Sequence, residues 1–184
     1  NDIIFNKDES YLNIDTNSRI NIEIDGKSKS SLINIMNKCK TSIGSRLLRT
    51  YFKYPTKNLK TIATRHLIID RLVQGHAFLK TQETLGYITD LERIISRAAL
   101  GTIKPNDLVS LQNSLEQIPV LKSSLDELDT KEIDHINTNI HQLDDLLTLL
   151  KSSLVENPPV TTRDGGVIKE GFDTELDRLK GIKN

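Results

Sequence analysis

Apolar side chains recur every three or four residues over most of this chain, which is the spacing that places them on one face of an α-helix. The pattern predicts a run of helices separated by short turns. They are expected within about 32–39, over about 43–54, from Asn58 onward, in a shorter piece around Ala77 to Leu79, from Thr89 or Asp90 to Gly101, and from Pro105 to Pro119.

The longest predicted helix runs from Asp129 or Thr130 to about Leu154. Its apolar positions are separated by three or four residues throughout: Ile133, Ile136, Ile140, Leu143, Leu147, Leu150 and Leu154. Such a seam suits antiparallel packing against neighbouring helices. A free coiled coil is a poorer interpretation, because the flanking positions carry no regular charge complement.

One region near the start alternates instead at period two, which indicates β-structure. Leu12 and Ile14 alternate with polar residues before a polar turn at 16–18, and alternation resumes after it at Ile20, Ile22 and Ile24. Tyr11 to Asp25 is therefore predicted to form a small hairpin. The predicted fold class is mainly α, a multi-helix bundle with long antiparallel helices and a small β-hairpin near the N-terminus.

Helix ends are marked by capping residues. Asn58 is suited to begin a helix whose apolar stripe, Leu59, Ile62, His66, Ile69 and Val73, would bury His66 as a hydrogen-bonded core residue. Thr89 and Glu92 have the spacing of a capping box, with Leu91, Ile94, Ile95 and Ala98 inward. Pro105 suits the first position of its helix, and Asp107 suits the first turn.

Composition narrows the kind of core. Aromatic residues make up 4% of the 184 residues, tryptophan is absent, and Cys39 is the only cysteine. We therefore expect aliphatic helix packing, a buried unreactive Cys39 and no disulfide within the chain. No apolar run approaches the roughly 20 residues that span a bilayer, and the first residues have no signal-peptide layout. The expected protein is cytoplasmic, with no membrane contact.

Charge is balanced overall and uneven along the chain. The formal net charge is zero, but residues 38–80 hold ten Lys or Arg against Asp70 alone, whereas residues 116–150 hold eight acidic residues against two lysines. Two explanations remain open. The two segments face each other inside the fold, or the basic segment faces nucleic acid; balanced total charge favours the first.

Five basic side chains are candidates for contacts with the DNA backbone or with another domain: Arg46, Arg49, Lys53, Arg93 and Arg97. In the 43–54 helix the first three lie opposite an apolar face made by Leu47, Leu48, Tyr51 and Phe52. Base stacking on Tyr51 and Phe52 is possible, but core packing fits their helical spacing better. Arg93 and Arg97 lie one turn apart, where Asp90 can reach Arg93, and a solvated helix face is the better default interpretation of them.

Residues for catalysis or for metal binding do not occur in recognisable patterns. The sequence has no glycine-rich turn followed by Lys and Ser or Thr, no Gly-x-Ser-x-Gly and no His-Glu-x-x-His. Its four histidines form no recognised metal-binding motif. We therefore expect this chain to be no enzyme, with no catalytic, cofactor-binding or metal-binding residues.

The segment from Pro158 to Asp177 is the most distinctive part of the sequence. Two prolines end the preceding helix near Val155. Asp164, Gly165 and Gly166 then supply a tight turn, Gly171 repeats the left-handed backbone, and Asp173 is placed to cap a new helix with Glu175 in its first turn.

This segment resembles the approach to the DNA clamp in the MutS family of mismatch repair proteins. Further blocks resemble the core domain of that family in the same order: Leu12 to Ile24, Thr41 to Pro55, and Asp90 to Leu108. Residues that match the family motifs are Gly44, Arg46, Leu47, Leu48, Pro55, Asp90, Leu91, Glu92, Arg93, Arg97, Pro159, Arg163, Asp164, Gly165, Gly166, Gly171, Asp173, Glu175 and Leu176. Tyr51 and Phe52 depart from it, since relatives often carry tryptophan there.

The resemblance implies an internal piece of a larger protein. It implies a lead-in segment with the hairpin at 1–28, a helical core domain at 29–157, a turn-rich connector at 158–172, and at 173–184 the start of a lever helix leading to a clamp beyond the chain. The implied function is to couple contacts on mismatched double-stranded DNA to a separate ATPase domain that binds ATP and magnesium. Implied partners are a second copy of the whole protein and a MutL-type repair protein. The alternative is a helical scaffold that binds protein partners and has no DNA role.

Overall fold

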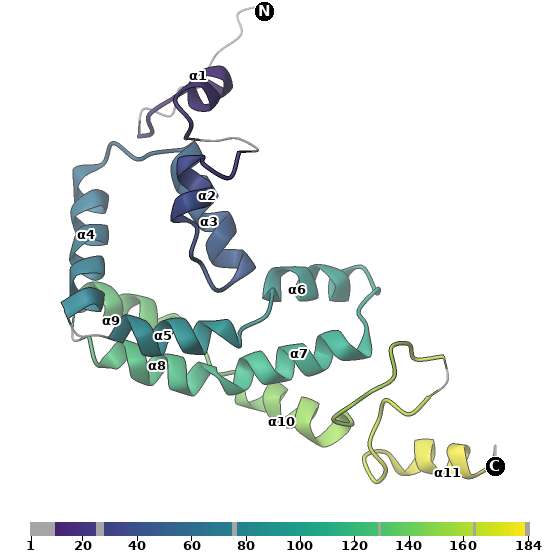
Figure 1. The fold of residues 1–184 in the computed structure, drawn as a ribbon. Helices are drawn as coiled ribbons and strands as arrows, with labels where there is room; N and C mark the ends of the chain where they lie inside the picture. The colour runs from purple at the N-terminus through teal and green to yellow at the C-terminus, as the bar shows by residue number, and fades with distance from the viewer. Residues whose placement is uncertain (1–9, 25–27, 75–76, 129, 164, 183–184) are drawn as a thin grey trace, which may run out of the picture.

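The computed structural model describes residues 10–24, 28–74, 77–128, 130–163 and 165–182. Over these residues the protein is mainly helical, as predicted (Figure 1). The helices are α1 (Thr16–Asn21), α2 (Leu32–Met36), α3 (Ser42–Lys53), α4 (Leu59–Gln74), α5 (Ala77–Gly86), α6 (Leu91–Ala99), α7 (Pro105–Glu116), α8 (Ile118–Asp126), α9 (Lys131–Thr138), α10 (Asp144–Ser153) and α11 (Thr174–Ile182). None of the helices described is long and apolar enough to cross a bilayer.

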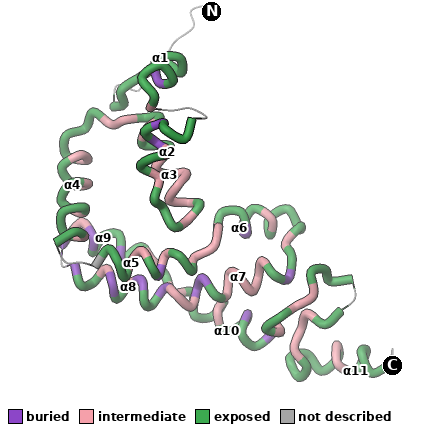
Figure 2. The backbone as a smooth tube through the Cα atoms, viewed as in Figure 1, coloured by how far each residue is buried: buried purple, intermediate pink, exposed green. Residues whose placement is uncertain are grey.

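An elongated body of helices carries most of the buried aliphatic side chains (Figure 2). Its first cluster joins α7, α10 and the start of α8 through Leu115, Ile118, Leu150 and Leu154. Partly buried side chains packed on it include Leu147 and, from the segment after α10, Ile168. A second cluster at the other end joins Leu128 and Ile133 to α4 and α8. We use "body" below for residues 59–153.

Residues 10–57 form a second unit, which we call the arm. Its two ends are tied together, because Tyr11 pairs with Thr56 in an isolated antiparallel bridge and the Leu12 N–H donates to the Pro55 carbonyl at 2.7 Å. Within it α2 packs on α3, and the Ile33 side chain is 2% exposed. The arm therefore has a small interior of its own.

The predicted hairpin is wrong. Thr16–Asn21 is a helix, which the Asp15 carboxylate caps by accepting the Ser18 N–H at 3.0 Å. Asp25 lies outside the described residues. The capping chemistry at Asp15 prevailed over the alternation of Ile20 and Ile22, whose side chains remain 51% and 61% exposed.

The long helix predicted from residue 129 or 130 to 154 is also wrong, because it is divided into α9 and α10. The Lys122 ammonium donates to the carbonyls of Asn137 and Ile140 at 2.7 and 2.9 Å, so a side chain from α8 satisfies the end of α9. Leu143 then takes a left-handed conformation with φ of 54° before α10 begins. Residue 129 lies outside the described residues.

Pro119 begins a helix instead of only ending one. It lies in the first turn of α8, where its missing N–H costs no hydrogen bond. Gln117 is the only residue between α7 and α8. The pattern analysis did not identify α8, because it treated the proline as a terminator.

Asn58 caps α4 as predicted, since its side-chain oxygen accepts the N–H groups of Lys60 and Thr61 at 3.0 and 3.2 Å. The predicted buried stripe of α4 is wrong. His66 is exposed and Val73 is 58% exposed. The neighbouring stripe that includes Ile68 and Leu72 packs on the second cluster instead.

Two smaller burial predictions also fail. Cys39 is exposed at the surface of the arm. On α6 the Ile94 side chain is buried as predicted, but Ile95 is 64% exposed. Ile94 and Ile95 are equally apolar, so hydropathy alone does not show which of the two has a packing partner.

The connector after α10 returns to the body before α11 begins. Leu154 and Ile168 form an isolated antiparallel bridge, and the Val155 N–H donates to the Val167 carbonyl at 3.1 Å. Gly165, Gly166 and Gly171 have φ near +75°, +74° and +83°, as the predicted turns require. Asp173 accepts the Leu176 N–H at 2.8 Å at the start of α11, also as predicted. Asp164 lies outside the described residues.

Candidate functional site

A bidentate ion pair joins the arm to the body. Arg46 on α3 donates from its two terminal nitrogens to the two carboxylate oxygens of Asp90, each at 2.8 Å, just before α6. The same guanidinium also contacts the Glu92 carboxylate. Arg93 adds a fourth charge, with its Nε 3.4 Å from Asp90. Planar guanidinium groups match carboxylates in this geometry better than lysine does.

The electrostatics of this junction favour the charged forms. Hydrogen bonding from Arg46 lowers the pKa of Asp90 to about 2 from its ordinary 3.8, with the Arg93 backbone N–H contributing in the same direction. The carboxylates of Asp90 and Glu92 raise the pKa of the Arg46 guanidinium. The Asp90 side chain is 15% exposed and that of Arg46 41%. The pair is thus partly shielded from solvent on the acidic side.

The capping box predicted from Thr89 and Glu92 is wrong for a related reason. Glu92 is engaged by Arg46, and the Thr89 N–H donates to the Ser114 hydroxyl of α7 at 3.0 Å. Asp90 is the residue at the cap position, and it makes no side-chain cap hydrogen bond. The Glu92 carboxylate and the Thr89 N–H, which a capping box would pair with each other, therefore both bind partners on other helices.

A second ion pair links α6 to α7. Arg97 donates to Asp107 at 2.8 Å, and the other oxygen of Asp107 accepts the Lys104 N–H at 3.0 Å. One carboxylate thus holds Arg97 and caps α7 at once. Together with the Arg46 junction, this pair connects α3, α6 and α7 in series.

The remaining candidate cations lie at the surface of the arm. Arg49 is exposed, and the Lys53 ammonium lies 5.2 Å from the centre of the Tyr54 ring. Neither has a carboxylate partner within the part of the chain that the structure describes. Tyr51, predicted to pack in the core, is 38% exposed, and the Arg65 guanidinium lies 3.8 Å from its ring centre. The Tyr51 ring is therefore not buried in a core, and it is not an open face for base stacking either.

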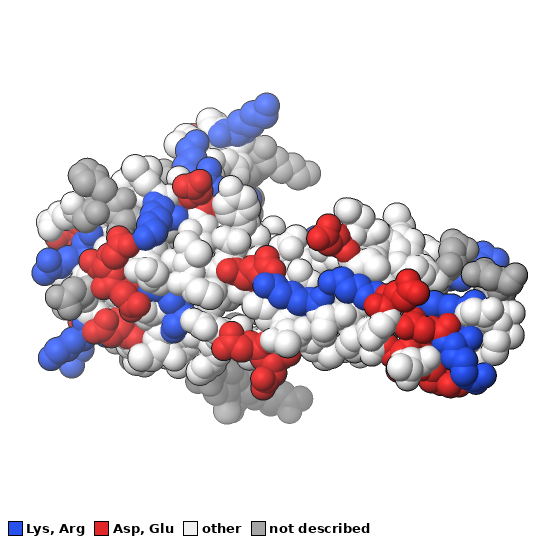
Figure 3. All heavy atoms as spheres, turned by 90° about the horizontal axis from the view of Figure 1, so that it is seen from below, with Lys and Arg blue, Asp and Glu red and all other residues white. Residues whose placement is uncertain are grey.

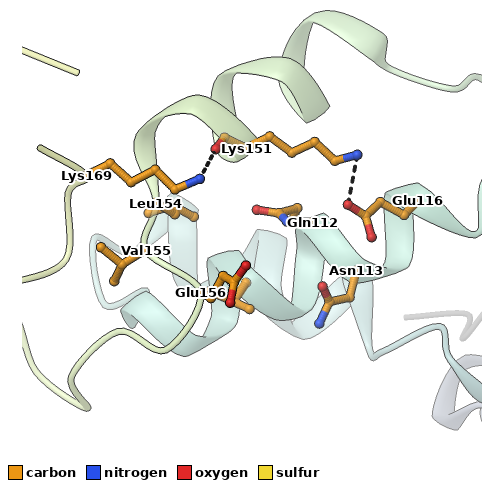
Figure 4. A pocket seen from close by; sticks show the side chains of 9 residues that line it. Gln112, Asn113, Glu116, Lys151, Leu154, Val155, Glu156 and Lys169 are labelled. Carbon is orange, nitrogen blue, oxygen red and sulfur yellow. Dashed lines mark hydrogen bonds and ion pairs between the residues drawn. The ribbon is translucent and has the colours of Figure 1, made fainter. Parts of the chain in front are cut away.

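A polar groove of about 480 Å³ lies where α7, α10 and the connector meet (Figure 4). Lys151 on α10 pairs with Glu116 on α7 at 3.0 Å, and the Lys169 ammonium donates to the Lys151 carbonyl at 2.5 Å. Gln112, Asn113 and Glu156 also line it. These contacts extend the connected series from α7 through α10 to the connector.

The structure supports the first explanation for the uneven charge. Helices α4 and α5, which begin within the basic segment 38–80, pack against α9 and α8, which lie within the acidic segment 116–150, and Lys80 pairs with Glu127 at 2.6 Å. Seen from below, acidic side chains gather at the end of the molecule formed by these helices, with basic ones beside them (Figure 3). The opposite end, with α11, carries both signs.

The residues of the predicted structural motif have local roles. The Gly44 N–H donates to the Thr41 hydroxyl at 3.0 Å, and an added Cβ would lie 3.0 Å from that oxygen. The Gly171 N–H donates to Asp177 at 2.7 Å. Pro159 is half-buried and Arg163 is exposed. None of these residues joins the ion pairs of α3, α6 and α7.

Sequence reasoning missed the partners that assemble these junctions, including Asp107, Ser114 and Glu116. Arg46 and Asp90 are 44 positions apart, so no local spacing connects them. Asp90, Arg93 and Arg97 were nevertheless identified as a charged cluster. No group of His, Cys, Asp or Glu able to hold a metal ion occurs among the residues described.

Comparison with protein families agrees with the helical architecture. The family model for MutS domain III matches residues 11–182, which is nearly the whole chain and includes both the arm and the connector. The match contains the Arg46 and Asp90 junction as well as the glycine turns before α11. The chain therefore belongs to the MutS domain III family, the helical domain of DNA mismatch repair proteins.

Proposed function

We propose that this chain is the connector between DNA contacts and a separate ATPase domain in a mismatch repair protein. The observation that carries the proposal is the series of junctions that runs from α3 through α6, α7 and α10 to the connector. Each junction joins two elements through paired polar groups. The first aliphatic cluster adds apolar packing between α7, α10 and the connector. We expect a movement imposed on α6 to be passed through α7 and α10 to the connector, because these elements are joined by both polar pairs and aliphatic packing.

The body lacks the long helix that the sequence analysis predicted from residue 129 or 130 to 154. The longest helix described has 16 residues, and no single helix spans the body. Instead α7 and α8 follow each other in one line along the body, separated only by Gln117 (Figure 1). Packed rods of this kind move as rigid bodies, so a small rotation at one end gives a larger displacement at the other.

The proposed organisation keeps residues 29–157 as the core and 173–184 as the start of a helix that leads to the clamp. The domain itself would catalyse nothing, and ATP and magnesium would bind outside it. Mismatched double-stranded DNA, a second copy of the protein and a MutL-type protein would be partners of the whole protein. We would expect the whole protein to act in the cytoplasm.

The proposal is tested by loosening the body without touching either proposed end. Leu147 on α10 packs on the first cluster, so Leu147→Gly removes a core side chain and weakens the helix, at a cost of a few kcal/mol. Thr148→Gly is the matched control, because Thr148 is exposed on the same helix. Both changes are made in the complete protein.

The measurement is ATP-triggered release from a mismatched duplex, followed by fluorescence anisotropy, together with ATP binding. We expect Leu147→Gly to slow ATP-triggered release about tenfold or more while ATP affinity changes little, and Thr148→Gly to resemble the parent. Circular dichroism verifies that both variants remain helical. Normal ATP-triggered release in a Leu147→Gly protein whose unfolding midpoint has fallen would overturn the proposal.

The scaffold alternative is less well supported by the structure. The apolar seam predicted up to Leu154 would offer such a scaffold a continuous partner-binding face, and the break between α9 and α10 interrupts that seam. Duplex binding with a steep dependence on salt would favour direct DNA contact by this domain. Partner binding that persists when the complete protein has lost DNA binding would favour the scaffold.

A further inference from the structure

The arm and the body have separate interiors. Ile33 is buried within the arm, whereas neither aliphatic cluster of the body includes a residue of the arm. α3 packs on α2, and no other helix of the described chain makes an extended contact with it. Among the residues that the structure describes, no buried aliphatic cluster contains side chains of both units.

Two contacts between the described parts of these units involve charged groups. Arg46 of the arm binds Asp90 and Glu92 of the body, and Arg65 of α4 lies over the Tyr51 ring of α3. The covalent connection is the short segment between the end of α3 and the start of α4 at Leu59. The Tyr11 and Thr56 bridge lies within this segment and ties it back to the start of the arm, so the bridge itself does not reach the helices of the body.

We propose that the arm is a hinged element and that Arg46 is the positioning residue that latches it against α6. The latch is bidentate and shared between two carboxylates, so it defines one orientation of α3. Its strength depends on ionic strength, because Arg46 is 41% exposed and salt screens exposed ion pairs. The inference stands independently of ATP coupling, since it concerns the position of the arm in the unliganded protein.

Arg49 provides an internal comparison. It lies one turn further along α3, is exposed, and has no carboxylate partner among the described residues. Removing its charge changes the net charge of the arm by the same amount as removing that of Arg46. Only the loss of the Arg46 charge is expected to open the latch.

The test measures the distance between arm and body in the complete protein. A spin label is attached to Cys39, which is exposed on the arm, and another to Thr148→Cys on α10, after other cysteines are replaced. Labelled protein is diluted with unlabelled protein so that only distances within one chain are recorded. Distance distributions are compared at about 0.05 M and about 1 M salt, where the Debye length falls to roughly 3 Å.

We expect a narrow distribution at low salt that broadens roughly twofold at high salt. Arg46→Ala should be broad at both salt concentrations, Arg49→Ala should resemble the parent, and the exchange Arg46→Asp with Asp90→Arg should restore much of the narrow distribution. A narrow distribution in Arg46→Ala at both salt concentrations would show that other contacts fix the arm. Failure of the exchange to narrow the distribution would also count against the latch, and circular dichroism identifies any variant that has unfolded.

Discussion

Helices α3 and α7 are each 12 residues long, and both follow the helical spacing of apolar residues, yet they are held in different ways. α7 buries Ser114 and Leu115 within the body, whereas α3 has no buried residue. α7 is fixed by aliphatic packing on α10, while α3 is attached to the body by the Arg46 ion pairs.

The difference shows that an amphipathic pattern predicts a helix but does not predict what covers its apolar face. Leu47 on α3 is 50% exposed, although it belongs to a stripe that satisfies the same spacing as that of α7. Packing on a second helix makes an element rigid, and a polar contact leaves it movable. The two regions should therefore respond differently to truncation, loss of hydrogen bonds, backbone strain and acid.

The largest expected effect is truncation in the body core. Leu115 is 4% exposed, so Leu115→Ala should lower the free energy of unfolding by about 2–5 kcal/mol through lost burial and the cavity left behind. Leu47→Ala in the arm should cost about 1 kcal/mol or less, because half of that side chain already meets water. Urea unfolding followed by circular dichroism measures both. Equal losses would show that the arm is packed as firmly as the body.

The second effect concerns a buried hydroxyl. Ser114 is 0% exposed, accepts the Thr89 N–H at 3.0 Å and donates to the Ser110 carbonyl at 2.8 Å. Ser114→Ala leaves the Thr89 N–H without that partner and should cost about 1–3 kcal/mol. Ser110→Ala is the control. Its hydroxyl donates only to a carbonyl in its own helix, so a loss of roughly 0.5 kcal/mol or less is expected in the same unfolding assay.

If Ser110→Ala proves as costly as Ser114→Ala, the contact between Thr89 and α7 contributes little to the body. Hydrogen exchange at the Thr89 amide gives a second measurement. We expect its protection to fall in the Ser114 variant and to remain in the Ser110 variant.

Features of the fold that depend on nearby residues could be predicted from the sequence. The caps at Asn58 and Asp173, the position of Pro105 at the start of α7, and the glycine turns of the connector all follow from residues within a few positions of each other. Backbone donors at a helix start need acceptors, and short polar side chains provide them locally.

Features that depend on distant residues could not be predicted. The ammonium of Lys122 ends α9 from another helix, and Arg46 reaches Asp90 across 44 positions. On α4 two adjacent stripes were both apolar enough to be buried, and the position of α9 decided in favour of Ile68 and Leu72. The candidate residues Arg46, Arg93 and Arg97 lie in ion pairs around α6. The local reach of Asp90 to Arg93 was expected from the sequence, whereas the carboxylates that bind Arg46 and Arg97 belong to other elements and depend on tertiary structure.

The third prediction tests backbone strain in the connector. Gly171 has a φ of +83°, so Gly171→Ala should cost roughly 1–2 kcal/mol of local stability, although an added Cβ would meet no atom within 4 Å. Gly86→Ala is the control, because Gly86 ends α5 without a positive φ and also has open space around it. That change should be neutral or slightly stabilising.

Hydrogen exchange over 167–180 reports the connector, and thermal unfolding reports the whole domain. Faster exchange in the Gly171 variant with an unchanged transition of the body would support a connector that responds separately. Unchanged exchange over 167–180 would contradict the strain argument.

The smallest expected effect is the response of the latch to acid. Because the pKa of Asp90 is lowered to about 2 in the folded protein from its ordinary 3.8, its ion pair contributes stability above pH 3.8, and this contribution is lost as the pH falls towards 2.

Asp90→Asn should be slightly less stable than the parent at neutral pH and should lose less stability between pH 4 and pH 2. The effect is small because Arg46 remains in contact with solvent. Unfolding free energies measured across this range would contradict the latch if Asp90→Asn and the parent fell in parallel. Such a result would mean that Asp90 has the same pKa in the folded and unfolded chains, and that the arm rests on contacts other than Arg46.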